Sequence, residues 1–430
     1  RVTPESLVSG AVEVLEGEGA VKVAGKRYEM GDGRIRMLAF GKASLLMAKA
    51  AESKLAGSLK RGIVISQPGE QAERMKEEGA LTSQIFTGAP GNVCDQDSVN
   101  AATQGMALAR EAAAEGGLLL VLISGGGSAL FTSPAEGISL EDKVKTTRAL
   151  QRHGASIQDL NTVRKHISAC KGGRLAVAAH PARVAALVLS DVIGDPLGSI
   201  ASGPTVCDAS TFADALRILE HVSEIPESVL KHVRAGVKGE VPETPKEGDE
   251  RIKGADTVVV GSNTMAAEAS RAKAEELGYA STVHTVGLCG DAEDAVAQIQ
   301  KVLEQNLQSG GKRCAIFAGE TTVRIGDAKG KGGRCTHMAL LLSQALQGVG
   351  GWMVLCGGTD GQDGPTDAAG AMADGGTVLR GSSVGVGAES YLLDKDSYTF
   401  FDKEGGLLRT GLTGTNVMDV HIVLSDGKSV

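Results

Sequence analysis

Short apolar segments alternate with longer amphipathic segments along most of the chain. The runs at 35–40, 118–123 and 184–190 are almost wholly apolar and end at glycine or acidic residues. Such runs are typical of strands that are buried on both faces of a parallel sheet. Apolar residues at helical spacing lie between them, as in 96–115, where Asp95 is expected to cap the helix. The pattern predicts an α/β fold with mostly parallel sheets.

The length of the chain predicts more than one domain, because 430 residues exceed what one hydrophobic core usually holds. At 238–253 the composition changes to Pro, Glu, Lys and Gly, which is typical of a linker. The alternation of strands and helices restarts after this segment. We therefore expect an N-terminal domain at 1–237, a linker at 238–253 and a C-terminal α/β domain at 254–430.

A glycine-rich loop follows the apolar run at 118–123. Three glycines without Cβ atoms let the backbone approach a ligand closely and take positive φ. Since the next helical pattern starts only after Ser139, we expect the loop to bind an anion through backbone N–H groups in a nest, and not at a helix N-terminus. The alternative is a tight turn without a ligand. The loop consists of Ser124, Gly125, Gly126, Gly127 and Ser128.

Basic residues at two further places suggest contacts with an anion. Lys42 follows the apolar run at 35–40, where it would suit a phosphate or carboxylate; the alternative is a solvated surface lysine. The stretch at 158–178 is either a solvated face or a set of groups that converge on an anionic substrate. Its basic residues are Arg164, Lys165, His166, Lys171 and Arg174.

Acidic residues follow the run at 184–190. Asp191 and Asp195 could hold Mg²⁺ or supply a general base. The alternative is an Asx turn. At least five predicted strands end in polar residues among glycines, and ligands of open α/β sheets bind beyond the carboxyl ends of strands. This repetition predicts an enzyme. Further polar ends carry Asn263, Glu320, Thr321, Asp360 and Asp367.

Composition and missing motifs narrow the chemistry. A net charge of −8 argues against a nucleic-acid surface, and no apolar run is long enough for a membrane span. Seven scattered cysteines without a C-x-x-C pair suggest reduced thiols. The chain lacks the P-loop, dinucleotide, zinc-protease and G-x-S-x-G motifs. Glycine-lined loops with cations and carboxylates remain, and phosphoryl transfer needs these groups.

Several long strings resemble the type-2 glycerate kinases, with the animal members as the nearest match. They cover nearly the whole chain in order and include ISGGGSALF, SDVIGDPLGSIASGPT, AGETTV, GKGGR and GGTDGQDGPTDAAGA. The resemblance implies two Rossmann-like domains, the second of the MOFRL type, with the active site in an interdomain cleft. It also implies transfer of the ATP γ-phosphoryl group to D-glycerate, giving 2-phosphoglycerate.

The resemblance implies roles for individual residues. The important lysine and arginine of the family match Lys42 and Arg334, which would neutralise the transferring phosphoryl group and orient glycerate. Asp191 is expected to be the general base or a Mg²⁺ ligand, with Asp195 in support. The loop at 124–128 is expected to surround nucleotide or substrate oxygens, together with Asn263, Glu320 and Thr321.

Some features depart from the family or stay open. Cys335, Thr336 and His337 replace the usual Asn-Gln-Glu after GGR. The amide and the carboxylate are lost, so we expect no family role to be kept at those two positions. An NAD(P)-dependent hydroxypyruvate reductase and a non-catalytic sensor of sugar or hydroxy-acid phosphates are the alternative functions. Expected partners are D-glycerate, ATP and Mg²⁺, with no nucleic acid or membrane; a homo-oligomer is left open. The expected compartment is the cytoplasm. Mitochondria are the alternative, because we expect the native N-terminus to be missing before Arg1.

Overall fold

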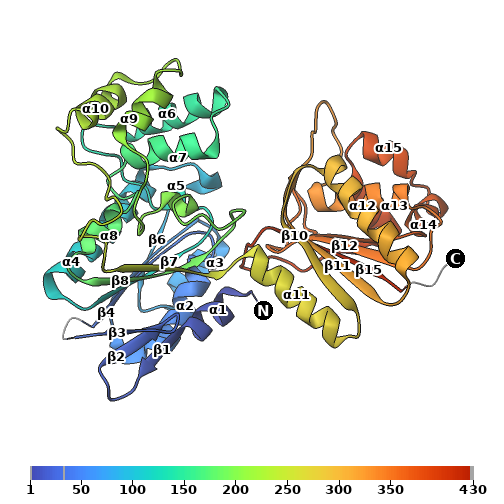
Figure 1. Cartoon of the computed structure of the whole chain (residues 1–430), viewed down its shortest axis with the longest axis horizontal. Coiled ribbons are helices and arrows are strands. Elements are labelled where there is room, and N and C mark those ends of the chain that lie inside the picture. The colour runs from blue at the N-terminus through green and yellow to red at the C-terminus, as the bar shows by residue number, and fades with distance from the viewer. Residues whose placement is uncertain (1, 32–33, 427–430) are drawn as a thin grey trace. The chain divides into compact units, whose positions relative to one another are not determined.

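The computed structural model describes residues 2–31 and 34–426, and these form two compact units (Figure 1). The first unit consists of Pro4–Ser190 and Asp195–Val260. The second unit is mainly residues 261–426, together with residues 2–3 and Asp191–Gly194. Each unit is built around its own six-stranded sheet.

The sheet of the first unit has the strand order β6-β5-β4-β7-β8-β9. The pairs from β6 through β8 are parallel, as their continuous apolar sequences predicted. Numbered along the sheet-forming chain, this order is 3-2-1-4-5-6, the order of doubly wound dinucleotide-binding folds. The strands are β4 (Ile35–Phe40), β5 (Leu59–Ser66), β6 (Gln84–Thr87), β7 (Leu118–Ile123), β8 (Arg183–Leu189) and β9 (Ala255–Gly261).

Helices connect these strands, and the longest follows the sequence prediction closely. α4 spans Gln96–Glu115, and the Asp95 side chain accepts a hydrogen bond from the Ser98 N–H in a capping box. The helices α6, α7, α9 and α10 form a cluster at one end of the unit around their own apolar core (Figure 1). The remaining helices are α2 (Ser44–Leu55), α3 (Glu70–Glu77), α5 (Gly127–Leu130), α6 (Leu140–Arg152), α7 (Ile157–His166), α8 (Arg174–Ala179), α9 (Phe212–Leu219) and α10 (Glu227–Val237).

A small antiparallel sheet precedes the main one. It consists of β1 (Val12–Leu15), β2 (Ala20–Val23) and β3 (Lys26–Glu29), and follows α1 (Pro4–Ala11). Asp256 of β9 connects the small sheet to the main sheet, because its carboxylate accepts hydrogen bonds from Lys26 Nζ (2.7 Å) and the Tyr28 hydroxyl (2.9 Å) of β3.

The second sheet departs from the prediction of mostly parallel strands. Its order is β10-β11-β15-β12-β13-β14, and only the β10–β11 pair is parallel among the described strand pairs. β15 lies antiparallel between β11 and β12, although these three strands are far apart in the sequence. The strands are β10 (Ala280–Asp291), β11 (Arg313–Thr322), β12 (Trp352–Gly358), β13 (Gly370–Asp374), β14 (Leu407–Leu408) and β15 (Asp419–Ser425).

Helices cover both faces of the second sheet. α11 packs on one face, and α12 and α13 pack on the other, where most of the apolar core lies (Figure 1). Three short helices complete the unit. The helices are α11 (Asn263–Glu276), α12 (Ala292–Ser309), α13 (Arg334–Ala345), α14 (Thr377–Ser383), α15 (Ala388–Leu393) and α16 (Ser397–Glu404).

The predicted linker at 238–253 lies within the first unit, and we call it the strap. Glu243 accepts a hydrogen bond from the Phe212 N–H, and Thr244 donates to Asp208 Oδ2 at 3.1 Å. β9, placed by the sequence in the second domain, joins the edge of the first sheet instead. The composition of the strap was misleading because polar anchors hold it against the unit together with only a few apolar residues, such as Val241 and Pro245.

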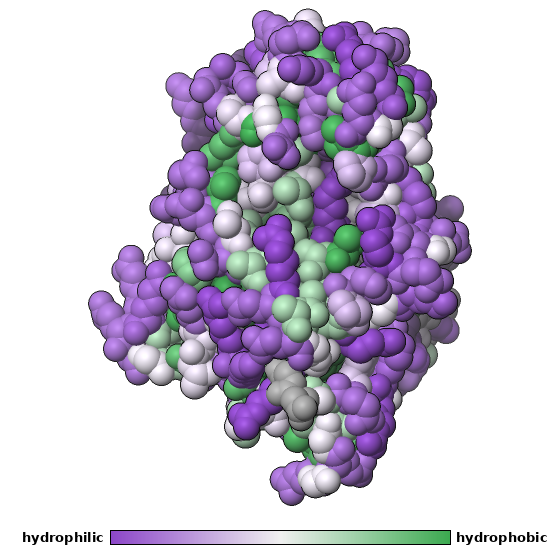
Figure 2. All heavy atoms as spheres, turned by 90° about the vertical axis from the view of Figure 1, so that its left-hand side faces the viewer, coloured by the Kyte–Doolittle hydropathy of each residue, from purple (hydrophilic) through white to green (hydrophobic). Residues whose placement is uncertain are grey.

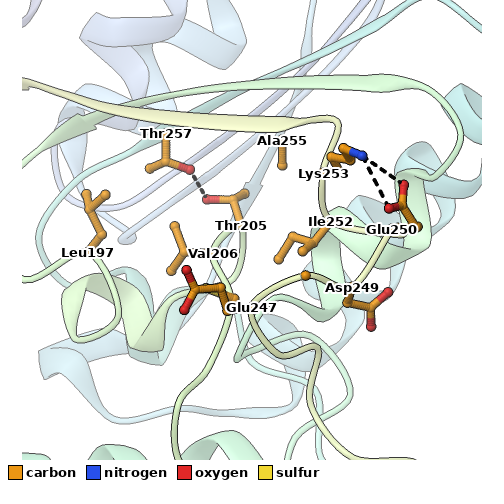
Figure 3. A pocket seen from close by; sticks show the side chains of 12 residues that line it. Leu197, Thr205, Val206, Glu247, Asp249, Glu250, Ile252, Lys253, Ala255 and Thr257 are labelled. Atoms are coloured by element: carbon orange, nitrogen blue, oxygen red, sulfur yellow. Dashed lines mark hydrogen bonds and ion pairs between the residues drawn. The ribbon is translucent and has the colours of Figure 1, made fainter.

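The strap also borders a pocket of about 350 Å³ in the first unit (Figure 3). Some of its polar groups are paired with one another: Thr205 and Thr257 share a hydrogen bond of 2.9 Å, and Lys253 lies 3.2 Å from Glu250. Glu247 and Asp249 also line the pocket, and Asp249 pairs with Arg251.

The surface seen from the side of the first unit is mostly hydrophilic, with apolar residues in scattered groups (Figure 2). Within residues 2–31 and 34–426, none of the helices combines the length and apolar character that membrane crossing requires. All seven cysteines are free thiols, in agreement with their scattered spacing.

Candidate functional site

The order of the first sheet brings Lys42 and the glycine loop together. β4 and β7 are neighbours at the point where the strand order reverses, and in such folds ligands bind beyond the carboxyl ends of these two strands. Lys42 follows β4, the glycine loop follows β7, and the Lys42 N–H donates to the Gly125 carbonyl at 2.8 Å. The Ala43 N–H donates to Ser124 Oγ at 3.0 Å, which fixes the two loops to each other.

The close approach explains one glycine in this region. At Gly41, φ is +124°, and a Cβ atom would lie 2.2 Å from Ser124 Oγ. Only glycine fits there without moving the loop. Gly41 therefore sets the distance between the two loops and the position of the following Lys42.

The glycine loop itself differs in part from the prediction. The short helix α5 begins inside it at Gly127, after Gly126 in the left-handed region, so the loop is not separate from a helix. Within the described part of the chain, the N–H groups of Gly125 and Gly126 donate no hydrogen bond. The backbone thus keeps free donors for an anion, as expected for a nest.

Lys42 is exposed, and its ammonium forms no ion pair with any residue that the structure describes. The glycine loop and the segment after β6 border its side chain: a Cβ atom on Gly126 would lie 3.3 Å from the Cγ of Lys42 and 3.1 Å from Asn92 Oδ1. Gln67, after β5, donates to Asn92 Oδ1 at 2.8 Å. Four strands therefore contribute their carboxyl ends to this region.

The second serine of the loop belongs to a line of polar side chains. Ser128 Oγ lies 3.2 Å from Ser202 Oγ, and Ser202 Oγ donates to Asn161 Oδ1 at 3.0 Å. Ala201 and Ser202 both have positive φ, a conformation that costs energy for residues with a Cβ atom. The loop after β8 is thus held in a strained form beside the glycine loop.

The basic residues predicted at 158–178 divide into two groups. In the first group, each side chain has a protein acceptor. Lys165 lies 3.0 Å from Asp208, His166 Nε2 lies 2.9 Å from Glu243, and Arg174 donates to the Lys165 carbonyl at 3.0 Å. These three stabilise the packing of the strap and α7 and form no solvated face.

The second group has no carboxylate partner. Arg164 forms no hydrogen bond or ion pair with a described residue. Lys171 is 1% exposed, and its ammonium donates to the carbonyls of Phe131 (3.2 Å) and Ala201 (3.4 Å). Burial lowers the pKa of Lys171 to about 7.

The structure adds Lys143 of α6 to this second group. It is 4% exposed and forms no ion pair with a described residue. The sequence contained a signal for it, because Lys143 lies on the same helical stripe as Thr146, Ala149 and Leu150, which are all buried. A lysine at an apolar position of an amphipathic helix indicates a buried charge.

Asp191 and Asp195 belong to different units, although only three residues separate them in the sequence. Asp191 belongs to the second unit and Asp195 to the first. Asp195 has φ of +52°, and its buried Oδ1 has no hydrogen-bond partner among described residues. Residues 2–31 and 34–426 contain no group of three or more His, Cys, Asp or Glu arranged to hold a metal ion. Mg²⁺ in kinases needs only one or two carboxylates besides the phosphates, so the free oxygen of Asp195 fits such a role.

In the second unit, Arg334 is the first residue of α13 and is fixed by carboxylates. Its guanidinium contacts both oxygens of Asp419, at 2.5 and 2.8 Å, and lies 3.3 Å from Glu320 Oε1. Burial opposes the charged form, but the hydrogen bonds and charge of Asp419 raise the pKa of Arg334 overall. The side chain is therefore a fixed cation.

The GKGGR sequence positions Arg334 through close packing. A Cβ atom on Gly333 would lie 2.2 Å from Asp363 Oδ1, and one on Gly332 would lie 2.5 Å from Ser397 Oγ. Asp363 is fully buried and accepts hydrogen bonds from the N–H groups of Cys335 (2.9 Å) and Thr336 (2.8 Å), which caps α13 from a distant loop. A Cβ atom would meet other residues more closely here than on Gly126 (3.1 Å) or Gly127 (3.0 Å) of the glycine loop.

The residues that depart from the family have internal partners. The Thr336 hydroxyl donates to Asp363 Oδ2 at 2.8 Å, and His337 Nε2 lies 3.3 Å from Lys395 Nζ. Burial and the charge of Lys395 lower the pKa of His337 to about 4. Thr336 therefore contributes to the cap of α13, and His337 is neutral near pH 7.

The other predicted ligands of the second unit have different surroundings. Asn263 is buried, and its amide nitrogen donates to the Val286 carbonyl at 2.6 Å while its oxygen has no partner among described residues. The Thr321 hydroxyl donates to Met338 Sδ at 3.3 Å inside the core, so it does not face a surface where a ligand could bind. Asp360 accepts from the Gln362 N–H and Asp367 from the Tyr398 hydroxyl, which are structural contacts.

Sequence reasoning missed several residues of the two candidate regions. Asp419, Asp363 and Ser202 lie far in sequence from the groups they hold, and their sequence surroundings gave no sign of these partners. Thr132 was also missed: it is fully buried, and its hydroxyl has no partner among described residues.

Comparisons with known proteins show what the chain is similar to. Residues 1–235 match the family described as "Domain of unknown function (DUF4147)", and residues 313–419 match the MOFRL family. The chain is similar to a glycerate 2-kinase of Pyrococcus horikoshii, with 38% identity over 99% of this chain and 94% of that protein. It is also similar to the glycerate kinase of Homo sapiens, with 35% identity over 98% of this chain and 90% of that protein.

Solved structures show the same similarity. A crystal structure of a glycerate kinase from Thermotoga maritima aligns with a TM-score of 0.82 and 36% identity, covering 91% of each chain. A crystal structure of a Pyrococcus horikoshii protein aligns with a TM-score of 0.85 and 36% identity, covering 99% of this chain and 95% of that one.

Proposed function

The chain belongs to the glycerate kinase family in which a DUF4147 region precedes a MOFRL region, and we propose that it transfers the γ-phosphoryl group of ATP to the C2 hydroxyl of D-glycerate. The products are ADP and 2-phospho-D-glycerate. One observation carries the proposal beyond the family: Lys42 and the free N–H groups of the glycine loop meet at the reversal point of the first sheet.

These groups suit a transferring phosphoryl group. Charge spreads over its oxygens in the transition state, and fixed backbone donors and a cation stabilise that charge. Gly125 and Gly126 supply donors, and Lys42 supplies an ammonium that no described carboxylate neutralises. We assign these residues to the phosphoryl group.

The remaining predicted residues receive roles in the same reaction. Asp191 is the proposed general base that takes the proton from the C2 hydroxyl of glycerate. The hydroxyl oxygen attacks the γ-phosphorus of ATP, and the bond between this phosphorus and ADP breaks. Asp195, with its free buried oxygen, is the proposed ligand of Mg²⁺, which supplies neutralisation of phosphate charge when bound. Arg334 is the proposed cation of the second unit, held in place by Asp419.

A coupled assay for ADP release, with D-glycerate as acceptor, tests the proposal, and ³¹P NMR gives the position of the phosphate. We expect ATP-dependent formation of the 2-phosphate. Turnover of NADH with hydroxypyruvate, or binding of glycerate without turnover of ATP, would contradict it. The turn after β4 reads Gly41-Lys42-Ala43-Ser44 and lacks the dinucleotide fingerprint, which disfavours the reductase.

A further inference from the structure

Three basic side chains of the first unit are withdrawn from water without a described carboxylate partner. Lys143 and Lys171 are 4% and 1% exposed, Arg164 is half-buried, and none forms an ion pair with a described residue. Withdrawing a charge from water is costly unless it is paired. A buried lysine without a charged partner either loses its proton or receives a ligand of opposite charge.

The three groups influence one another electrostatically, although they come from α6, α7 and the turn before α8; α6 and α7 pack against each other. The charge of Arg164 disfavours protonation of both lysines, and that of Lys143 disfavours protonation of Lys171, so burial and these charges lower the pKa of each lysine. The other titratable groups that influence the cluster are the thiols of Cys94 and Cys170. Burial and these charges therefore favour the neutral lysines while no anion is bound, and a bound anion would favour their charged forms.

Polar atoms without partners accompany the cluster. The Lys171 ammonium donates to the carbonyls of Phe131 and Ala201, which fixes its position. The residue after Phe131 is Thr132, whose fully buried hydroxyl has no partner among described residues. A small ligand with both a negative charge and hydroxyl groups would satisfy the charges and this hydroxyl.

The cluster adjoins the glycine loop. Ala201, which accepts from Lys171, precedes Ser202, whose hydroxyl lies 3.2 Å from Ser128 Oγ. On another side, Cys94 follows two residues after Asn92, whose side chain borders Gly126. All of these residues belong to the first unit. A ligand on the cluster would thus lie beside the groups assigned to the phosphoryl group.

We infer that Lys143, Arg164 and Lys171 bind the carboxylate of the phosphoryl acceptor, a small hydroxy acid. The inference rests on the proposed function and identifies which residues recognise the acid group of D-glycerate. A guanidinium and two ammonium groups match the charge and planar shape of a carboxylate. Thr132 follows Phe131, and Ser128 contacts Ser202 beside Ala201, so their hydroxyls suit the hydroxyl groups of the same molecule. The glycine loop remains for the phosphate.

Variants with matched neighbours test the inference. We expect Lys143→Met and Arg164→Met each to lower kcat/KM for D-glycerate by about 10- to 100-fold, the scale of one lost charged hydrogen bond, with KM for ATP unchanged. Lys145→Met is the control, because Lys145 lies on the same helix and pairs with Glu141 at the surface. It should leave all constants unchanged.

Two further measurements separate recognition from a structural role. The neutral methyl ester of D-glycerate lacks the negative charge, so its slow turnover should be the same in the wild type and in both variants. Lys143→Met should also leave the melting temperature unchanged or raise it, since it removes an unpaired buried charge. A lysine with a structural role would instead lower the melting temperature and affect both acceptors equally.

Each other outcome is decisive. An active wild type whose kcat/KM for glycerate is unchanged in both variants would overturn the carboxylate assignment. A rise in KM for ATP alone would do the same and would place nucleotide phosphates on the cluster. A wild type that does not phosphorylate glycerate would overturn the proposed function itself.

Discussion

The cations of the two units have opposite surroundings. In the second unit, Arg334 is held by both oxygens of Asp419 and by Glu320. In the first unit, Lys143, Arg164 and Lys171 are withdrawn from water without any described carboxylate partner. A neutralised cation is fixed in position, whereas cations that are not neutralised favour an anion from outside. The first unit therefore favours binding of a negatively charged group, whereas the second unit holds one cation in a fixed position.

The glycine-rich sequences of the two units show a parallel contrast. Gly125 and Gly126 leave their N–H groups free, whereas Gly332 and Gly333 lie against Ser397 and Asp363. Similar sequences thus serve ligand access in one unit and close packing in the other. Glycine content alone does not distinguish the two roles; the surroundings of each Cα do.

The largest expected effect tests whether the first unit acts on the phosphoryl group. Lys42→Ala should lower kcat by about 10²-fold or more, the scale of one lost electrostatic partner in a transition state. The melting temperature should not change, because Lys42 is exposed and has no ion pair with a described residue. Steady-state kinetics and thermal unfolding measure both. Lys49→Ala, an exposed lysine of α2, is the control, and an equal kcat for both variants would remove Lys42 from the reaction.

The second prediction tests the fixed cation. Asp419→Ala should lower the free energy of unfolding by about 3 kcal/mol or more, because it leaves the partly buried guanidinium of Arg334 without its main partner. Urea unfolding measures this change. Asp367→Ala, which removes an exposed pair with Arg409, should cost less than about 1 kcal/mol. Equal stability of the two variants would show that Asp419 does not hold Arg334.

The third prediction concerns glycine packing. Gly333→Ala should lower the free energy of unfolding by about 1–3 kcal/mol, because the new Cβ would collide with the Asp363 carboxylate that caps α13. Gly387 is the matched control: it precedes α15, has negative φ, and a Cβ atom there would meet only Ser390 Oγ at 3.6 Å. If Gly333→Ala and Gly387→Ala unfold at the same urea concentration, the packing explanation fails.

The smallest expected effect is a pH dependence of acceptor binding. With burial lowering the pKa of Lys171 to about 7, a bound carboxylate favours the protonated lysine. KM for glycerate should therefore be constant below that pKa and rise with pH above it, by at most about tenfold per pH unit for one proton. The other titratable groups that influence the Lys171 ammonium are Lys143, Arg164, Cys94 and the neighbouring Cys170. The Lys171→Met variant should lose the pH dependence; an unchanged profile would assign it to another group.

The sequence by itself determined most elements of the first unit. Continuous apolar runs identified β4 and β7, and Asp95 marked the start of α4, because burial and capping leave local signals in the chain. The positions of Lys42 and the glycine loop at strand ends were also visible. What the local pattern could not give was which strands are neighbours.

Only the tertiary structure decided how these elements combine. The strand order placed β4 beside β7, so that Lys42 met the glycine loop, and it inserted β15 between β11 and β12, so that Asp419 met Arg334. It also turned Lys143 into a buried charge and held the strap against the first unit. Periodicity reports whether a side chain is buried, but packing between distant segments determines which partner it finds there.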